Sequence, residues 1–402
     1  MAIKQPHELN WKKTDIDKER SLPAINWDAL QEYAIALRQA QGDDGPPPTC
    51  NLLPQYNMGG LHIIRLLQFN DGARWVARIQ LHSGSDESAK RLLHEVHTLS
   101  VIREQRRVPV PEVFGYESTT NNPVGVAFIL MDFVPGDSAM DSFGGWHAHH
   151  GKIPSRYKSK FYHQVAQMQA DLASIRFPMI GRITQRSDGS FAIDAIPGIG
   201  GPFSTAADYL EAWSQNAKFP VPEKELRSML PPDLEDELIL SIQRFPAKLA
   251  ASVRRIPLKD GPFPLYHPDL FHSNIIIDSD YNVLSIIDWE NACTVPWEVV
   301  QFPMFLASTP PPMDAPWNYD DAGEPTNQEI RERWQEQKEY LQSVMEAEER
   351  RKLDHMLSST LADRDVQNLA GAIKLYLDPG KIGYYCKVLD CLRFMLGDVL
   401  CK

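Results

Sequence analysis

The sequence predicts an α+β fold with two lobes, a small antiparallel sheet that carries one helix and a larger part that is mainly helical. Two observations lead to this prediction. Residues 51–135 hold short apolar segments separated by turn residues, with one helical segment among them, which is typical of a small sheet with a helix packed on it. Residues 136–402 carry apolar residues mostly at helical spacing and include one apolar hairpin at 265–290. Residues 1–50 form an N-terminal extension with one helix, so we predict three parts in the chain.

The composition limits the location and the partners of the protein. A hydrophobic fraction of 43% with 23% charged residues is ordinary for a soluble globular chain of 402 residues. The net charge of −12 argues against non-specific binding to nucleic acid, whose phosphates attract basic surfaces. The N-terminus lacks the apolar run of a signal peptide, no apolar stretch is long enough to span a bilayer, and the five cysteines form no CxxC pair. We therefore expect a cytoplasmic protein with no nucleic-acid or membrane partner, and the oligomeric state stays open.

The helix of the extension is predicted from about Asp28 to Gln41. Leu30, Ala34 and Leu37 fall on one face of this helix, and Asn26 or Asp28 can cap its N-terminus. The sheet lobe follows from about Leu52 and is predicted to end at Pro135-Gly136. Its expected elements, in order, are strands at 61–69 and 73–81 joined by the turn Asn70-Asp71-Gly72, a helix at 86–103, and strands at 110–116 and 126–133.

In the helical lobe, the spacing of apolar residues predicts helices at 155–176 and 328–352. The apolar stretch Val295–Leu306 is predicted to begin a buried helix. A polar loop runs from Pro310 to about Asn327 and is longer than a connection normally needs. It is either a mobile lid or disordered.

The hairpin at 265–290 carries the residues with the clearest chemical meaning. A strand leads to His267-Pro268-Asp269, and Asn274 follows five residues after Asp269. Two apolar strands joined by a turn then end in Asp288. Phosphoryl transfer needs such a set, because one carboxylate accepts the proton of the attacking hydroxyl while an amide and a second carboxylate hold the cations that neutralise the phosphates.

A plainer interpretation is a surface hairpin whose Asp and Asn residues form turns. This interpretation explains 278–282 well. It explains Asp288 poorly, because an unpaired carboxylate directly after Ile286 and Ile287 would be costly to bury. We therefore favour the functional interpretation.

The hairpin resembles the catalytic and metal-binding core of the aminoglycoside phosphotransferase and choline kinase family, particularly its fungal-type branch. The resemblance extends over most of residues 25–300 and includes the segments YNMGGLHIIRLLQFNDGARWVARI and NPVGVAFILMDFVPG. It implies a protein-kinase-like fold and transfer of the terminal phosphate of ATP, or of GTP, to a hydroxyl group of a small molecule. It also implies that Asp269 is the catalytic base and that Asn274 and Asp288 bind Mg²⁺.

The sheet lobe contains an expected ion pair. Period-two alternation places Val76 and Arg78 on one face of their strand. Glu95 lies within the apolar stripe of the following helix, where a carboxylate needs a cation, and Arg78 is its natural partner. By resemblance, Arg78 takes the place of the lysine that binds the nucleotide phosphates, a departure that leaves bidentate contacts possible. The alternative is a purely structural ion pair.

The resemblance also assigns the remaining nucleotide contacts. Gly59 and Gly60 come just before a strand, where a glycine-rich loop would cover the phosphates. Backbone groups from Asp132 to Val134 would meet the adenine edge. Trp289, Glu290 and the helix after Gln328 are candidate walls for the acceptor.

The leading hypothesis is therefore an ATP- and Mg²⁺-dependent small-molecule kinase. A catalytically silent nucleotide-binding protein and an enzyme that transfers a nucleotidyl group remain the alternatives. The short distance in sequence between Asp288 and the apolar stretch from Val295 leaves little room for an activation loop of the kind that protein kinases use. We therefore expect a small-molecule acceptor that the sequence does not identify.

Overall fold

The computed structural model describes residues 11, 25–41, 47–82, 84–142, 145–150 and 152–392. The chain forms two compact units. We call Met1–Gly145 with Thr184–Phe191 and Ser273–Asn291 the sheet unit. The helical unit consists of Trp146–Ile183, Ala192–His272 and Ala292–Lys402. The predicted α+β class is confirmed, because an antiparallel sheet dominates the first unit and helices dominate the second.

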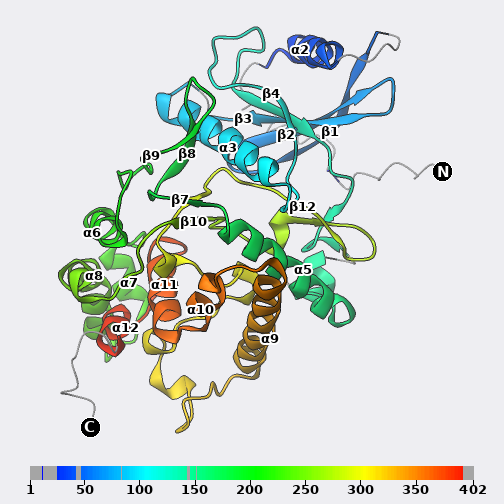
Figure 1. The fold of residues 1–402 in the computed structure, drawn as a ribbon. Coiled ribbons are helices and arrows are strands. Elements are labelled where there is room, and N and C mark those ends of the chain that lie inside the picture. The colour runs from blue at the N-terminus through cyan, green and yellow to red at the C-terminus, as the bar shows by residue number, and fades with distance from the viewer. Residues whose placement is uncertain are drawn as a thin grey trace. The chain divides into compact units, whose positions relative to one another are not determined.

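The sheet unit contains a five-stranded antiparallel sheet (Figure 1). Its strands lie in the order β1 (Cys50–Met58), β2 (His62–Phe69), β3 (Arg74–Gln80), β5 (Phe128–Asp132) and β4 (Val113–Glu117). The sequence did not predict β1. Gly59 and Gly60 therefore lie in the turn of the β1–β2 hairpin, where the Gly59 N–H donates to the His62 carbonyl (3.0 Å), and not in a loop ahead of the first strand.

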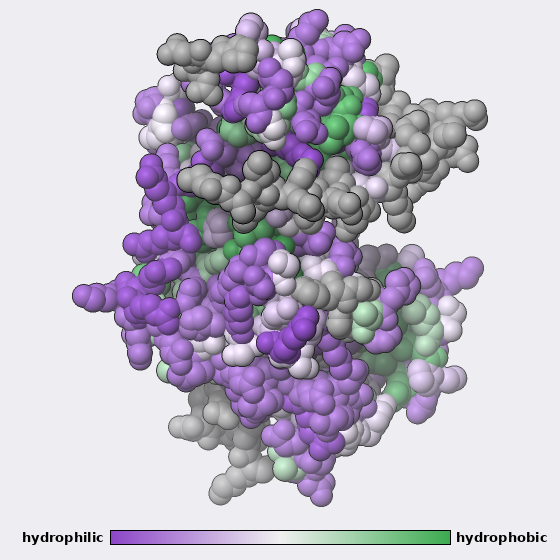
Figure 2. Space-filling view, turned by 90° about the vertical axis from the view of Figure 1, so that its right-hand side faces the viewer, coloured by the Kyte–Doolittle hydropathy of each residue, from purple (hydrophilic) through white to green (hydrophobic). Residues whose placement is uncertain are grey.

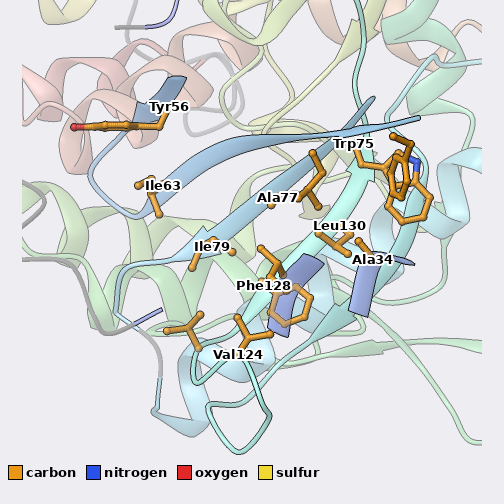
Figure 3. Packing of buried hydrophobic residues seen from close by; sticks show 13 residues of the cluster. Ala34, Tyr56, Ile63, Trp75, Ala77, Ile79, Val124, Phe128 and Leu130 are labelled. Carbon is orange, nitrogen blue, oxygen red and sulfur yellow. The ribbon is translucent and has the colours of Figure 1, made fainter. Parts of the chain in front are cut away.

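Two helices cover the two faces of this sheet. On one face, Trp75, Ala77 and Ile79 of β3 pack in a cluster with Leu30 and Ala34 (Figure 3). The last two residues belong to α2 (Trp27–Ala40), whose N-terminus is capped by the Asn26 side chain. The N-terminal extension is thus part of the sheet unit, since its helix completes an apolar core that the sheet cannot close alone.

The other face of the sheet is covered by α3 (Asp86–Gln105). Leu92 and Val96 of this helix pack with Ile129 and Met131 of β5. A capping box formed by Ser85 and Ser88 begins the helix. The predicted alternation along β3 is confirmed, because Val76 packs on the α3 side while its neighbours face α2.

A second, three-stranded sheet joins the hairpin to the sheet unit. Its order is β12 (Val283–Ile286), β11 (Ile275–Ile277) and β6 (Asp137–Ser138). Residues 273–291 therefore belong to the sheet unit and not to the helical part, and the unit extends past the predicted boundary at 135. The reason is backbone pairing, since β6 follows that boundary and bonds directly to β11.

The helical unit contains most of the helices. They are α5 (Ser155–Ala173), α6 (Ala206–Asn216), α7 (Glu223–Met229), α8 (Glu235–Ser252), α9 (Gln328–Arg351), α10 (Met356–Ala362), α11 (Arg364–Leu377) and α12 (Tyr385–Cys391), and a short helix, α4 (Gly145–His149), precedes them. A three-stranded sheet has the order β13 (Cys293–Thr294), β10 (Phe263–Tyr266) and β7 (Arg176–Phe177). Strand β8 (Arg182–Gln185) pairs with β9 (Phe191–Asp194), and the middle of this hairpin, Thr184–Phe191, belongs to the sheet unit. Helix α5 packs against α9, where the Tyr340 hydroxyl bonds to Gln169 Oε1 (2.8 Å).

One prediction about the helical unit was wrong. The stretch 295–306 forms two 3₁₀ turns, Trp297–Val299 and Met304–Leu306, instead of a helix, because Pro296 and Pro303 each precede a turn and interrupt the backbone bonding. The loop from Pro310 to Asn327 has defined structure. It contains two further 3₁₀ turns, and the Asp314 carboxylate accepts bonds from Asn318 (2.9 Å) and Tyr319 (3.2 Å).

The surface turned to the viewer in Figure 2 is mostly hydrophilic, with apolar residues gathered in a few places. Among the residues that the structure describes, none of the helices combines the length and the hydropathy required to cross a bilayer.

Candidate functional site

The hairpin of β11 and β12 places Asn274 and Asp288 at the same end of one strand pair. Ile275 pairs with Ile286, and the Ile287 N–H donates to the Asn274 carbonyl (2.9 Å). Asp288 follows directly with a φ of 66°, a conformation that Asp tolerates better than most residues. Its side chain is 46% exposed, so the carboxylate is not buried behind the strand as the sequence suggested.

Arg78 connects three carboxylates in the sheet unit. It donates to Glu95 of α3, which is the predicted ion pair. Arg78 Nη2 also donates to Asp288 Oδ1 (3.0 Å) and to Glu290 Oε2 (3.2 Å). The Arg78 and Glu95 side chains are 10% and 3% exposed, so their interaction is little screened by water. The guanidinium therefore holds the helix, the sheet and the predicted metal ligand together.

Glu290, which the sequence analysis offered only as a candidate wall for the acceptor, is a further residue of this site. The structure buries it beside Arg78, where Arg91 Nη1 donates to Glu290 Oε1 (3.4 Å) and His62 Nδ1 lies 3.5 Å from Oε2. The available signal was its spacing, since Asp288 and Glu290 flank the buried Trp289.

Burial changes the acidity of two groups around Arg78. Burial raises the pKa of Glu95 to about 7 despite the Arg78 charge, and the nearby Glu290 and Asp288 raise it further. Burial, together with the Arg78 and Arg91 charges, lowers the pKa of His62 to about 3. His62 is therefore neutral near pH 7.

These groups line one pocket of about 500 Å³, which we call the sheet pocket. Its lining includes every predicted site residue except Asp269, namely Gly59, Gly60, Arg78, Glu95, Asp132, Val134, Asn274 and Asp288. A Cβ atom added at Gly59 or at Gly60 would have no other atom within 4 Å, so the space beside both glycines is empty. The volume lies in the range of about 300–1,000 Å³ that is typical of small-molecule sites.

The segment after β5 lines this pocket and includes a backbone donor without a partner among the described residues. The Val134 N–H makes no hydrogen bond with any residue that the structure describes. The Asp132 carboxylate instead accepts a bond from the Glu112 N–H, so this side chain has a structural role, and burial raises its pKa. Val76 and Met131 provide apolar wall next to these groups. This combination suits a flat heterocycle that needs one edge donor.

Asp269 belongs to the helical unit. Its side chain is exposed, and its backbone is fixed by a bond from its N–H to His267 Nδ1 (3.2 Å) and one from the Phe271 N–H to its carbonyl (2.8 Å). His272, three residues later, is 1% exposed and lies among the aromatic rings of Phe271 and Phe305.

The oxygen donors in the sheet unit fit a magnesium ion only in part. Asn274 and Asp288 offer an amide and a carboxylate, which are suitable ligands. Across the residues with described positions, no group of three or more His, Cys, Asp or Glu side chains could hold a metal. Magnesium usually binds through one or two protein ligands together with substrate phosphates, so this set fits an ion that enters with a nucleotide.

The chain is similar to proteins from several fungal sources. It is 29% identical over 130 residues to a subtelomeric hrmA-associated cluster protein of Aspergillus fumigatus, covering 32% of this chain and 24% of that protein. It is 23% identical over 328 residues to altered inheritance of mitochondria protein 9 of Saccharomyces cerevisiae, covering 67% of this chain and 51% of that one. The chain thus spans about half the length, or less, of these relatives.

Among solved structures, one to which the chain is similar is the macrolide 2′-phosphotransferase MphH from Brachybacterium faecium. The TM-score is 0.43 at 14% identity, and the match covers 91% of this chain and 97% of the other.

The cytoplasmic location expected from the sequence is contradicted by these comparisons. Matching proteins from four species, including Saccharomyces cerevisiae and Candida tropicalis, carry a name that places them in mitochondria.

A comparison of the chain with known protein families shows to which family it belongs. The matching family is described as the phosphotransferase enzyme family. The match covers residues 65–298, which is more than half of the chain. It includes β3, α3 and the hairpin, and so confirms the resemblance found in the sequence. The chain belongs to the phosphotransferase enzyme family.

Proposed function

We propose that the protein is an ATP-dependent phosphotransferase that moves the terminal phosphate of the nucleotide to a hydroxyl group of a small molecule. The observation that carries this proposal is the contact of Arg78 with both Glu95 and Asp288 at the wall of the sheet pocket. A kinase needs a cationic side chain held by a helix carboxylate beside its metal ligand, and this arrangement supplies both.

The residues divide into binding and reacting groups. The Val134 N–H and the apolar wall of Val76 would hold the base of the nucleotide, and GTP remains possible in place of ATP. Arg78 would donate to phosphate oxygens, and Gly59 and Gly60 would let the backbone approach them.

Magnesium, when bound, would neutralise phosphate charge, with Asn274 and Asp288 as its protein ligands. Acidic side chains outnumber basic ones in the sheet pocket, where Arg78 is the one Lys or Arg among the described lining residues. A nucleotide would therefore need its cations to enter a pocket of this charge.

Asp269 would accept the proton of the acceptor hydroxyl. Its exposed carboxylate and its fixed backbone suit that role, because a general base must be reachable by the substrate and held in place. The chain between Asp288 and the 3₁₀ turn at Trp297–Val299 is short, which supports a small-molecule acceptor over a peptide.

One observation favours a catalytically silent nucleotide-binding protein as the second candidate. The Asp288 carboxylate is already paired with Arg78, so an ion must compete with a guanidinium for it. Such a protein would bind ATP and transfer nothing.

A screen for labelled products tests the proposal. The purified, unphosphorylated protein is incubated with ATP labelled in its terminal phosphate, Mg²⁺ and a metabolite library, and products are identified by mass spectrometry. We expect a metabolite that gains one labelled phosphate, and no labelling of generic peptides. A product that gains a nucleotidyl group would show the alternative transfer reaction. ATP binding without any labelled product would support the silent protein.

A further inference from the structure

The helical unit contains a second pocket, which is lined by none of the residues assigned to nucleotide binding, metal binding or proton transfer. It has a volume of about 300 Å³, and it lies among the segment 301–311, α9 and the region from α10 to α11. Its lining residues come from a stretch that includes the long proline-rich loop, whose length the fold alone does not explain. Four side-chain amides line it, those of Gln301, Gln337, Gln367 and Asn368, and we call it the amide pocket.

The three glutamines are oriented by the backbone. Each uses its Nε2 group to donate to a main-chain carbonyl. For Gln301, Gln337 and Gln367, the acceptors are the carbonyls of Ala370 (3.0 Å), Leu306 (2.8 Å) and Val300 (2.9 Å), in that order. A carbonyl oxygen can only accept, so the nitrogen must face it and the amide oxygen must face away.

The three amide oxygens remain available as acceptors. None of them accepts a hydrogen bond from another residue that the structure describes, and none belongs to the buried polar atoms that lack a partner. An atom without a partner that is not fully buried is reachable by a solute, and the three residues line the pocket, so these oxygens are candidate acceptors for a ligand there.

Asn368 adds donors to this set. Its side chain is 8% exposed and makes no hydrogen bond with the described part of the chain. The Asn368 amide is not among the fully buried polar atoms that lack a partner, so a ligand in the pocket can reach it and bond to it. Asn368 offers two N–H donors and one oxygen acceptor.

Most of the remaining lining residues are either apolar, or charged and exposed to solvent. Phe302, Pro310 and Leu341 provide apolar surface. The charged side chains at the pocket, Glu324, Lys338 and Arg364, are exposed and therefore hydrated. The interior carries amides and no charge, so it favours a neutral ligand.

We propose that the amide pocket binds a neutral polyhydroxylated small molecule, such as a sugar or a sugar alcohol. Hydroxyl groups would donate to the three glutamine oxygens, and the Asn368 amide would donate to a hydroxyl oxygen. The C–H surface of the ligand would lie on the apolar walls. The proposal does not depend on phosphate transfer, because none of the residues assigned to nucleotide binding, metal binding or proton transfer lines this pocket. Helix α9, which the sequence suggested as a wall for the acceptor, does contribute to it.

Ligand-observed NMR and calorimetry test the proposal on the full chain. The probes are D-glucose, D-xylose and D-glucitol, and cyclohexanol serves as an apolar compound of similar ring size. We expect at least one of the polyols to bind and cyclohexanol not to bind. Asn368→Leu, which keeps the branched shape and removes the amide, should weaken polyol binding about tenfold or more. Gln342→Met is the control, because Gln342 is an exposed amide outside the pocket, on α9, the helix that contributes Gln337 to the pocket.

A second variant separates loss of the binding site from loss of the folded structure. Ala307→Trp fills the pocket from its exposed rim and should abolish polyol binding without lowering the unfolding temperature. If Asn368→Leu fails to fold, Ala307→Trp decides. The proposal is overturned if none of the three polyols binds, or if binding is the same in the parent and in Ala307→Trp.

Discussion

Arg78 and Asp288 lie 210 positions apart in the chain and are joined by a hydrogen bond of 3.0 Å. Arg78 holds Glu95 at the same time, so one guanidinium links the helix of the sheet unit to its predicted metal ligand. A lysine ammonium is a single point charge, whereas the guanidinium fork can hold several carboxylates at once. The substitution of arginine at this position is therefore compatible with a kinase site, and it adds a competitor for Asp288.

The first prediction concerns the Arg78–Glu95 pair. Arg78→Met and Glu95→Gln should each weaken ATP binding, and the double variant should cost less than the sum by about 1 kcal/mol or more, because both residues act through one ion pair. Titration calorimetry measures the four affinities. The exposed pair Arg103–Glu112 of the same unit is the control, and removing it should leave the ATP affinity unchanged. Strictly additive effects for Arg78 and Glu95 would mean that the two residues do not act together.

The second prediction concerns the metal. Asp288→Ala should remove the Mg²⁺ dependence of ATP affinity, because it removes the charged ligand to the ion. It should not weaken binding of ATP without Mg²⁺, because it also frees Arg78 from a competing carboxylate. Calorimetry with and without Mg²⁺ gives both values. Asp280→Ala, at an exposed position in the turn of the same hairpin, should behave as the parent. Equal Mg²⁺ dependence in Asp288→Ala and the parent would remove Asp288 from metal binding.

The third prediction concerns stability against acid. The pKa of His62 is about 3 in the folded protein against an ordinary value of 6.5, so the unfolded chain binds more protons between these values. The free energy of unfolding should therefore fall as the pH falls below 6.5. Between about pH 7.5 and about pH 5.5, the parent should lose about 1.4 kcal/mol that His62→Asn does not lose.

Urea unfolding of both proteins at the two pH values measures this difference. His82→Asn is the control, because His82 is an exposed histidine of the same unit, and it should lose as much stability as the parent. The same loss in His62→Asn and in the parent would contradict a neutral, buried His62.

The fourth prediction concerns the N-terminal helix. Leu30 is fully buried in the core that α2 shares with the sheet, so Leu30→Ala should destabilise the sheet unit by about 2–5 kcal/mol. Gln39→Ala, at an exposed position of the same helix, should change stability by less than about 0.5 kcal/mol. Chemical unfolding compares the two variants. An effect of Leu30→Ala as small as that of the control would mean that α2 is not part of this core.

The strands with strong local signals were predictable from the sequence. Asn70-Asp71-Gly72 marks the turn between β2 and β3, and the apolar pattern marks β5. Strand β1 was missed because it contains Pro54, a residue that central strands avoid, and the pairing with β2 shifts its register between Leu52 and Tyr56. The sequence pattern did not reveal that α2 closes the core of the sheet, since the apolar face of a helix does not indicate which element it packs against.

The part of the candidate site that could be predicted is the interaction between two elements that follow one another in the chain. The Arg78–Glu95 pair follows from two faces that meet across consecutive elements. The contacts of Arg78 with Asp288 and Glu290 join positions more than 200 residues apart, and only the folded chain shows them. His62 was missed for the same reason, because its meaning comes from burial next to Arg78 and Arg91 and not from its sequence neighbours.

The most direct test of the proposed phosphotransferase is the rate of phosphate transfer in Asp269→Asn. With the acceptor found by the product screen, the variant should lose about two orders of magnitude or more in turnover, because the acceptor hydroxyl loses its base. Its ATP affinity should stay near that of the parent, since the residues that line the sheet pocket are unchanged. An unchanged transfer rate in Asp269→Asn would contradict the assignment of this residue and the mechanism built on it.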